Sequence, residues 1–254
     1  MLSKEKIEEE LRKIGIEPPK IVFYNETDST NIRAKEYARS TAERETVVFI
    51  AERQSAGRGR LGRSFVSKGG GIYMSILTYP KECGFDATRS TAEAAVGLAR
   101  ATDSLCGCKT DIKWVNDIFL GGKKLAGILT EGEMDSEGKI AFQVVGMGIN
   151  IYKKAISEEI KDIATSIEEE LENVPDSSAL TARIIAEVIE PKGNIFKEYK
   201  ARSLVIGKRV KVQKATESYY GEVIDINPDY SLRIKTDSGI QSLFTGEVSL
   251  RLND

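Results

Sequence analysis

The feature that most constrains the fold of this sequence is a change in its pattern near residue 203. Before that point, apolar runs typical of strands alternate with segments of helical periodicity. After it, short strand-like runs recur at roughly ten-residue spacing, separated by the turn segments NP (227–228) and DSG (237–239). The pattern predicts an α+β domain over residues 1–202 and a small β-barrel over residues 203–254.

Hydrophobic periodicity predicts the elements of the first domain. Residues 3–14 form a charged helical pattern with Ile7, Leu11 and Ile14 on one face, which makes residues 1–20 a short N-terminal helical segment. Gly121-Gly122 predicts a hairpin. Strands are expected at 21–27, 46–54, 71–79, 111–120, 124–134 and 139–152, and helices at 31–40, at 85–105 and between 157 and 200.

The composition excludes several classes of protein. The 254 residues include 37 Lys+Arg and 39 Asp+Glu, a net charge of −2, which argues against a surface made for nucleic acid. No histidine is present, so mechanisms that need an imidazole base or a His-ligated metal are excluded. Cys83, Cys106 and Cys108 lack zinc-finger spacing and favour free thiols in a reducing compartment. With neither a secretory signal nor an apolar run long enough to cross a membrane, we expect a cytoplasmic protein.

The first segment that could bind a ligand is QSAGRGRLGR, residues 54–63. Its glycines let backbone amides approach a ligand, and its arginines offer planar donors to phosphate or carboxylate oxygens. A mobile solvated loop, or an arginine–glycine contact to nucleic acid, would use the same residues. The apolar strand that leads directly into the segment favours a ligand-binding loop.

Two further segments carry polar groups next to apolar runs. Asn116 and Asp117 follow the only tryptophan, in KWVND, although Asn and Asp are poor strand residues. They could hold a ligand or a metal–phosphate group, or simply end the strand, and the residues alone leave both open. Lys124 begins the strand KLAGIL and could offer positive charge to an anion, but a solvent-facing hairpin lysine fits the same pattern.

Together these segments resemble a known family. In the order found in biotin–protein ligases, the chain carries TDSTN (27–31), GRGRLGR (57–63), KWVNDI (113–118), KKLAGIL (123–129), GMGIN (146–150) and GEVSLR (246–251). The resemblance covers nearly the whole chain. It implies a mixed-sheet, class II synthetase-like ligase domain followed by an SH3-like barrel, in the short form that lacks an N-terminal DNA-binding domain.

The resemblance also implies roles for individual residues. Catalysis would use Arg58, Arg60, Lys124 and Asp117. Biotin would be bound by Ser29, Thr30, Gln54, Gly57, Arg58, Arg60, Lys124 and Gly127. The nucleotide would be bound by Asn31, Arg63, Phe65, Lys113, Asn116, Asn150 and Arg251, with Asp117 an indirect contact to Mg²⁺.

Two positions depart from the family pattern. Val115 stands where family members usually have proline, a change expected to alter the strand little. Phe65 stands where many have tryptophan, which would leave a smaller platform for adenine.

The reaction implied by the resemblance consumes biotin and ATP, with Mg²⁺, in two steps. Biotinyl-5′-adenylate forms with release of pyrophosphate, and a lysine of a biotin carboxyl carrier domain then takes the biotinyl group as AMP leaves. Homodimers are common in the family. Neither nucleic acids nor membranes are expected as partners.

Other functions are less favoured. A lipoate–protein ligase shares the fold and the two-step logic, but usually carries a different arginine–glycine signature. A biotin-responsive repressor needs several helices before the ligase motifs, whereas about 22 residues precede them here and include the acidic run Glu8-Glu9-Glu10. A biotin sensor without ligase activity would not need the residues on the nucleotide side.

Overall fold

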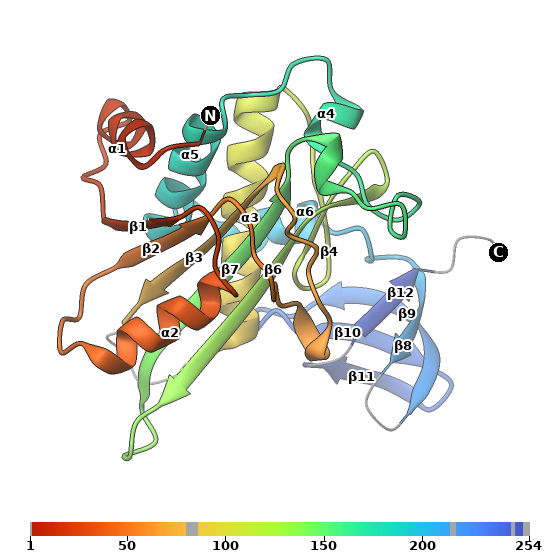
Figure 1. Ribbon diagram of the computed structural model, residues 1–254. Coiled ribbons are helices and arrows are strands. Elements are labelled where there is room, and N and C mark those ends of the chain that lie inside the picture. The colour runs from red at the N-terminus through yellow and green to blue at the C-terminus, as the bar shows by residue number, and fades with distance from the viewer. Residues whose placement is uncertain (1, 80–85, 214–216, 245–246, 251–254) are drawn as a thin grey trace.

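A seven-stranded mixed sheet is the frame of the first part of the chain (Figure 1). The structure is a computed structural model that describes residues 2–79, 86–213, 217–244 and 247–250. The strand order is β1-β2-β3-β7-β6-β5-β4; β1 and β2 are parallel and the other neighbours are antiparallel, which confirms the expected mixed α+β fold. The strands are Lys20–Tyr24 (β1), Val47–Ala51 (β2), Gly71–Thr78 (β3), Asp111–Lys113 (β4), Asp117–Leu120 (β5), Lys123–Met134 (β6) and Ile140–Asn150 (β7).

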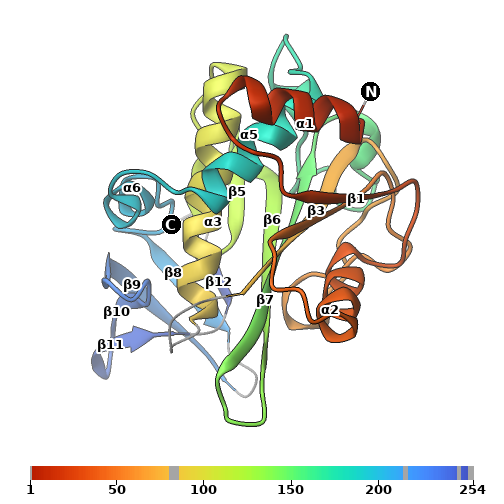
Figure 2. The same ribbon diagram turned by 90° about the vertical axis from the view of Figure 1, so that its left-hand side faces the viewer.

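Helices cover both faces of this sheet, with α1, α3 and α5 on one face and α2 on the other (Figure 2). Side chains alternate along β2, so Val48 and Ile50 pack in the larger core, while Val47 and Phe49 pack with Ala34 of α2. In the described part of the chain, no helix is long and apolar enough to cross a membrane. The helices are Lys4–Lys13 (α1), Thr30–Ser40 (α2), Ala87–Cys106 (α3), Ile167–Glu170 (α4), Ser177–Ile189 (α5) and Ile195–Ala201 (α6), with 3-10 helices at Arg60–Gly62 (η1) and Lys153–Ala155 (η2).

Helix α1 follows the predicted pattern except at its end. Ile7 and Leu11 are fully buried, as expected. The prediction that Ile14 shares their face is wrong, because Ile14 is 41% exposed. The helix ends at Lys13, and Ile14 caps it with non-helical backbone angles, so its side chain leaves the buried stripe.

The segment predicted as one strand, residues 111–120, is instead two antiparallel strands, β4 and β5. The chain reverses through Trp114, Val115 and Asn116, and the Trp114–Val115 peptide bond is cis. Both apolar side chains are buried, and Nδ2 of Asn116 donates to the backbone oxygen of Ile128 (3.2 Å). Burial of the two apolar residues and this amide contact favour the turn over a continuous strand, where Asn is a poor fit.

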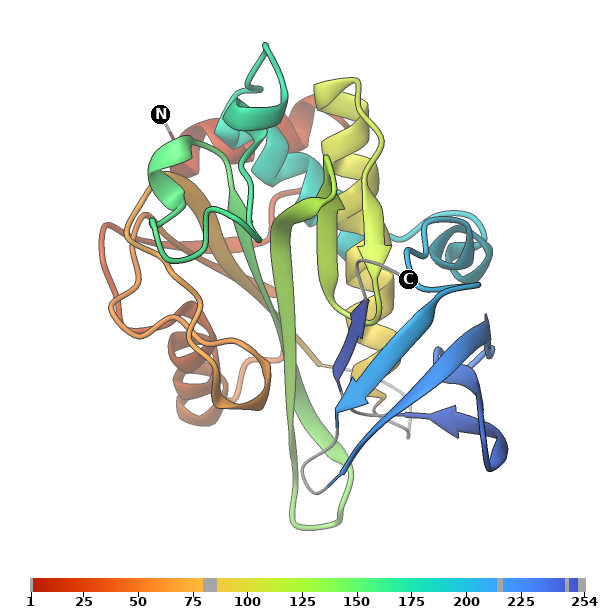
Figure 3. The ribbon, with the colours of Figure 1, turned by 90° about the vertical axis from the view of Figure 1, so that its right-hand side faces the viewer.

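The C-terminal residues form a second, five-stranded antiparallel sheet in the order β11-β10-β9-β8-β12, beside α3 and α6 (Figure 3). This confirms the succession of short strands expected after residue 203. At the first predicted turn, the backbone nitrogen of Tyr230 donates to the backbone oxygen of Asn227 (2.8 Å). The SH3-like character of this part stays a prediction. The strands are Arg209–Gln213 (β8), Ser218–Ile226 (β9), Leu232–Thr236 (β10), Gly239–Leu243 (β11) and Glu247–Leu250 (β12).

Aromatic residues join the two sheets. Nε1 of Trp114 donates to the backbone oxygen of Tyr230 (2.8 Å), and the Tyr230 ring meets the rings of Tyr199 and Phe196 edge to face, with centroids 5.3 and 5.5 Å away. Burial raises the pKa of Tyr199 well above its ordinary value, so its phenol stays protonated and donates to the backbone oxygen of Val115 (3.2 Å). The small sheet therefore rests on the turn that carries Asn116.

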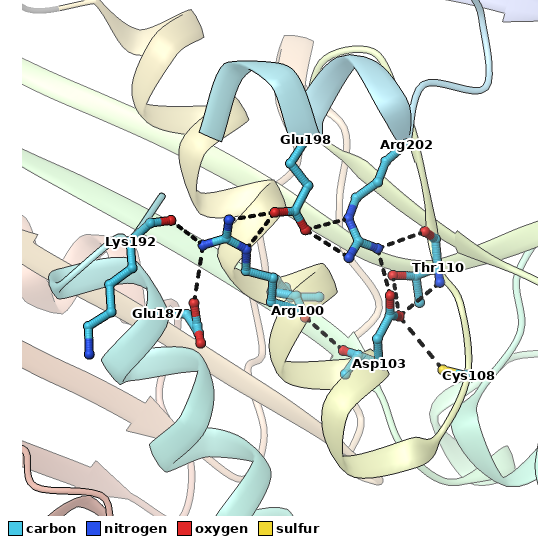
Figure 4. Close-up of polar contacts among 10 residues, drawn as sticks. Arg100, Asp103, Cys108, Thr110, Glu187, Lys192, Glu198 and Arg202 are labelled. Carbon is cyan, nitrogen blue, oxygen red and sulfur yellow. Dashed lines mark hydrogen bonds and ion pairs between the residues drawn. The ribbon is translucent and has the colours of Figure 1, made fainter. Parts of the chain in front are cut away.

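Ion pairs tie α6 to α3 and α5 (Figure 4). Arg100 of α3 donates through Nε to Glu198 of α6 (2.8 Å) and lies 3.5 Å from the carboxylate of Glu187 in α5. Arg202, which follows α6, pairs with Asp103 of α3 (2.6 Å) and with Glu198 (2.9 Å). Because α6 leads into the small sheet, this network helps to hold the junction in place.

Glu198 should make stability depend on pH. Burial raises the pKa of its carboxyl, but hydrogen bonds from Arg100 and Arg202 outweigh burial and hold the pKa below its ordinary value of 4.5. The resulting stabilisation is present above the unfolded pKa and is lost as pH falls through the folded pKa. In urea unfolding, Glu198→Gln should be less stable than wild type at neutral pH and lose less stability between about pH 5 and pH 3. Equal pH slopes in the two proteins would contradict this role.

Candidate functional site

A pocket opens over β6 and β7, with about 480 Å³ of space when the part open to solvent is included. Its walls come from the start of α2, the arginine–glycine loop, the turn after β4 and the two strands. Of the residues predicted from the sequence, it brings together Ser29, Thr30, Asn31, Gln54, Arg58, Arg60, Phe65, Asn116, Lys124 and Gly127. Its lining is completed by Gly59, Ile128, Leu129, Gly146, Met147 and Gly148.

The floor of the pocket is open because glycines face each other across β6 and β7. Gly127 lies opposite Gly148 in the register of the two strands. A Cβ at Gly148 would lie 2.4 Å from the Phe65 ring, and one at Gly146 would lie 2.1 Å from Oδ1 of Asn31. Both distances are far below van der Waals contact, so the missing side chains make room for Phe65 and Asn31.

One end of the pocket is a chain of amide and hydroxyl groups. The backbone nitrogen and Oγ1 of Thr30 both donate to Oε1 of Gln54 (2.8 and 3.1 Å), and Nε2 of Gln54 donates to Oγ of Ser67 (3.0 Å). Oγ of Ser75, fully buried on β3, lies 2.7 Å from Oγ1 of Thr30 and 2.6 Å from Oδ1 of Asn31. This polar end suits a compact ligand that both donates and accepts hydrogen bonds.

The other end of the pocket is charged. Nζ of Lys124 lies 2.8 Å from Oδ1 of Asp117, which also accepts from Nδ2 of Asn116 (2.8 Å). Nη1 of Arg60 donates to Oδ1 of Asn116 (3.0 Å), so the loop arginine joins the same network. Two cations face one carboxylate in this group, which leaves it net positive and suited to an anionic ligand.

The glycine floor separates the two ends. Nζ of Lys124 would lie 3.3 Å from a Cβ at Gly127, which pairs with Gly148. Asn31 faces Gly146, two residues earlier on β7. Because two residues of a strand span roughly 7 Å, a ligand along the floor can place a polar ring at Asn31 and an anion at Lys124.

Comparison with known proteins identifies this arrangement. The sequence model of the protein family described as "Biotin/lipoate A/B protein ligase family" matches residues 23–150. A second family model, described as "Biotin protein ligase C terminal domain", matches residues 205–251. The chain belongs to the biotin/lipoate protein ligase family.

Individual relatives agree with this assignment. The biotin–[acetyl-CoA-carboxylase] ligase of Mycobacterium tuberculosis is 30% identical over 74% of this chain and 72% of its own length. The bifunctional ligase/repressor BirA of Bacillus subtilis is 29% identical over 91% of this chain and 74% of its own. The Aquifex aeolicus biotin protein ligase, solved with biotin and ATP, superposes with a TM-score of 0.73 at 29% identity, covering 91% of this chain and 98% of that one.

Some residues predicted from the family motifs do not line the pocket. Gly57 is buried against the backbone that follows the loop, where a Cβ would lie 2.4 Å from the backbone oxygen of Phe65. Lys113 lies over the Phe119 ring (5.8 Å), and Nδ2 of the buried Asn150 donates to the backbone oxygen of Thr165 (3.1 Å). Arg63 is exposed, and Arg251 lies outside the described residues. Residues outside the lining are Gly57, Arg63, Lys113, Asp117 and Asn150.

The structure adds residues that the motifs of the family did not indicate. Ser75 lies in the expected strand 71–79, and a serine inside the run GIYMSILTY is the one signal in the sequence that points to it. Glu131 accepts from Nδ2 of Asn31 (2.8 Å), and nothing in the spacing of residues 31 and 131 pairs them. Gly146 and Gly148 stand in the quoted GMGIN segment, but their use as a pocket floor depends on the β6–β7 register.

Gly146→Ala tests the crowded floor of this ligase-family pocket. The new Cβ would meet Oδ1 of Asn31 at 2.1 Å, so the amide would have to leave its contact with Ser75. We expect the free energy of unfolding, measured in urea, to fall by about 1–3 kcal/mol. Gly59→Ala is the control, because its Cβ would lie 3.4 Å from the nearest atom. Similar losses in the two variants would show that the floor is not tight.

Proposed function

We propose that this chain is a biotin–protein ligase that uses ATP to attach biotin to a lysine of a biotin carboxyl carrier domain. The main support is a single pocket with a hydrogen-bonding chain at Asn31 and a cationic network at Lys124, joined by a glycine floor. Biotin has the same layout, with a ureido ring, an apolar stem and a carboxylate. The names of the Mycobacterium and Aquifex relatives support the same reaction.

The polar end supports biotin over lipoate. The dithiolane ring of lipoate is a weak hydrogen-bond partner and would leave the groups of Thr30, Asn31 and Gln54 without ligand contacts. The ureido ring of biotin offers both donors and an acceptor to them. The match to the C-terminal domain model of biotin protein ligases supports the same choice.

The pocket suits the first chemical step. A carboxylate oxygen of biotin bonds to the α-phosphorus of ATP, and pyrophosphate leaves. Both reactants are anions, so the step chiefly needs fixed positive charge, which Lys124 and Arg60 supply and to which Arg58 on the loop adds. In the second step the amine nitrogen of the carrier lysine bonds to the acyl carbon, AMP leaves, and the amine loses its proton to solvent.

The residue roles combine this layout with the roles that the family resemblance implies. Asn31 was expected on the nucleotide side, but its contact with Ser75 leads us to assign it to the biotin ring. Asp117 would orient Lys124 through their 2.8 Å ion pair. The biotin set is then Ser29, Thr30, Asn31, Gln54, Gly57, Arg58, Arg60, Lys124 and Gly127, and the nucleotide set is Arg63, Phe65, Lys113, Asn116, Asn150 and Arg251.

Magnesium fits this site as part of the nucleotide substrate. Among the residues that the structure describes, no three His, Cys, Asp or Glu side chains converge as a metal-binding group. Asp117 is the carboxylate of the charged end and already contacts Lys124 and Asn116. Mg²⁺ is commonly held by substrate phosphates with one or two carboxylates, so we place it on ATP, with Asp117 as an indirect contact.

Several finer proposals accompany this function. We propose that the ligase domain ends at residue 202 and the small domain begins at residue 203, near the start of the second matched model. We further propose a cytoplasmic homodimer that does not bind DNA. The apolar residues of α1, Ile7 and Leu11, are buried in the ligase core, which does not suit a DNA-reading helix. Light scattering at the monomer mass, or a salt-sensitive gel shift, would contradict these points.

Pyrophosphate exchange tests the function. The purified chain should exchange labelled pyrophosphate into ATP with biotin and not with lipoate, because biotin pairs with the polar end. Addition of a biotin carboxyl carrier domain should then release AMP and label the carrier. Exchange with lipoate alone would move the assignment to lipoate ligases, and no exchange with either acid would remove the ligase function.

Lys124→Ala tests the cationic end. Loss of one preorganised charge at the reacting atoms should slow adenylate formation by about 10²–10³-fold. Lys123→Ala is a matched control at the neighbouring position. Nζ of Lys123 donates to the backbone oxygen of Lys161 (2.9 Å), and Lys123 does not line the pocket. Single-turnover formation of biotinyl-adenylate measures both. A near-wild-type rate for Lys124→Ala would exclude this lysine from the reaction.

A further inference from the structure

Glu131 lies behind the polar end of the pocket and contacts two residues of α2. Its carboxylate accepts from Nδ2 of Asn31 (2.8 Å) and pairs with Nζ of Lys35 (2.7 Å). Asn31 and Lys35 are four residues apart, so they lie on one face of the helix. The side chain of Glu131 is 25% exposed and that of Lys35 17%, so this contact is largely removed from solvent.

We propose that Glu131 is a positioning residue that fixes the amide of Asn31 with its oxygen toward Ser75 and thereby sets the direction of the hydrogen bonds at the polar end. This inference rests on the proposed function, in which that end binds the ureido ring of biotin.

The direction follows from what each group can do. An ionised carboxylate only accepts hydrogen bonds, so it must take the NH₂ side of the Asn31 amide. The backbone oxygen of Leu129, 3.4 Å from the same nitrogen, requires the same orientation. The amide oxygen is thereby directed at Ser75, 2.6 Å away. A neutral partner that can both donate and accept would leave only the longer contact with Leu129 to oppose a 180° rotation of the amide.

The carboxylate stays ionised. Burial raises the pKa of Glu131, but the hydrogen bonds from Lys35 and Asn31 outweigh burial, and the pKa lies below its ordinary value. The positive charge of Arg58, which lines the pocket, acts in the same sense.

The far end of the chain is fixed independently. The backbone N–H of Thr30 can only donate, and it donates to Oε1 of Gln54 (2.8 Å), which turns the NH₂ group of Gln54 toward Ser67. The amides of Asn31 and Gln54, at the two ends of the chain that runs through Ser75 and Thr30, are therefore each held in one orientation. A ligand meets a fixed pattern of donors and acceptors, so binding does not cost free energy for ordering these groups.

Glu133 is a matched control on the same strand. It stands two residues after Glu131, on the same face of β6, and pairs with Arg39 of α2 (Nε to Oε2, 3.0 Å). Its side chain is more exposed, at 37%, and neither partner lines the pocket. If Glu131 only fastened α2 to β6, the two glutamates would behave alike.

The test measures biotin binding by calorimetry and pyrophosphate exchange in the full-length wild type, Glu131→Gln and Glu133→Gln. Glu131→Gln should weaken biotin binding by about tenfold and raise the KM for biotin equally, the scale of one misdirected hydrogen bond. The KM for ATP and kcat at saturating biotin should change by less than about twofold, because the charged end is untouched. Glu133→Gln should leave biotin binding unchanged.

The decisive part of the test exchanges the amide and the carboxylate between positions 31 and 131. Asn31→Asp alone places two carboxylates together and should weaken biotin binding at least as much as Glu131→Gln. The double variant Asn31→Asp/Glu131→Gln lets the new glutamine donate to the new carboxylate, which again presents an acceptor to Ser75. It should bind biotin more tightly than either single variant.

The outcomes separate the two hypotheses. If the wild type binds biotin and exchanges pyrophosphate, but Glu131→Gln matches Glu133→Gln or the double variant shows additive loss, the positioning role is overturned and the ligase function stands. If the wild type shows neither binding nor exchange, the proposed function itself fails. A Glu131→Gln chain that does not fold, while the double variant folds and binds biotin, would support the directed contact.

Discussion

The register between β6 and β7 is the constraint on which the whole site depends. Ala126 and Ile149 pair within the core, so the neighbouring pair, Gly127 and Gly148, must face the opposite side of the sheet. A slip by one residue would bring core side chains to the pocket floor and move the glycines into the core. Burial of the apolar face therefore fixes the position of the glycine floor. The packing of the sheet also determines where the polar groups around that floor lie.

Local signals in the sequence predicted much of the fold. The hairpin at Gly121-Gly122 is confirmed, with both glycines at positive φ (58° and 82°), because such a turn needs that backbone geometry. The succession of strands after residue 203 is also confirmed. Its signals, alternating apolar residues and turn residues, are local too, because they act over only a few positions. The reversal at Trp114 was missed, because it depends on burial against Tyr230, more than a hundred residues later.

The residues of the candidate site likewise fall into those that the sequence predicted and those that only the fold reveals. The motifs that the family resemblance supplied, such as the loop with Arg60 and the strand with Lys124, come together around one pocket. Their partners could not be predicted, because Ser75 and Glu131 contact Asn31 only through pairings between distant strands and α2. Sequence patterns thus indicated which groups meet the ligand, whereas the groups that orient them required the fold.

The junction between the two sheets has a practical consequence. The chain contains one tryptophan, and Trp114 is buried where the small sheet, through Tyr230, meets the turn before Asn116. Indole fluorescence in this protein therefore originates from a single place. Parting of the two sheets would expose that indole to water and shift its emission to the red, while the larger sheet could remain folded. The fluorescence of Trp114 is thus an intrinsic probe of the contact between the two sheets.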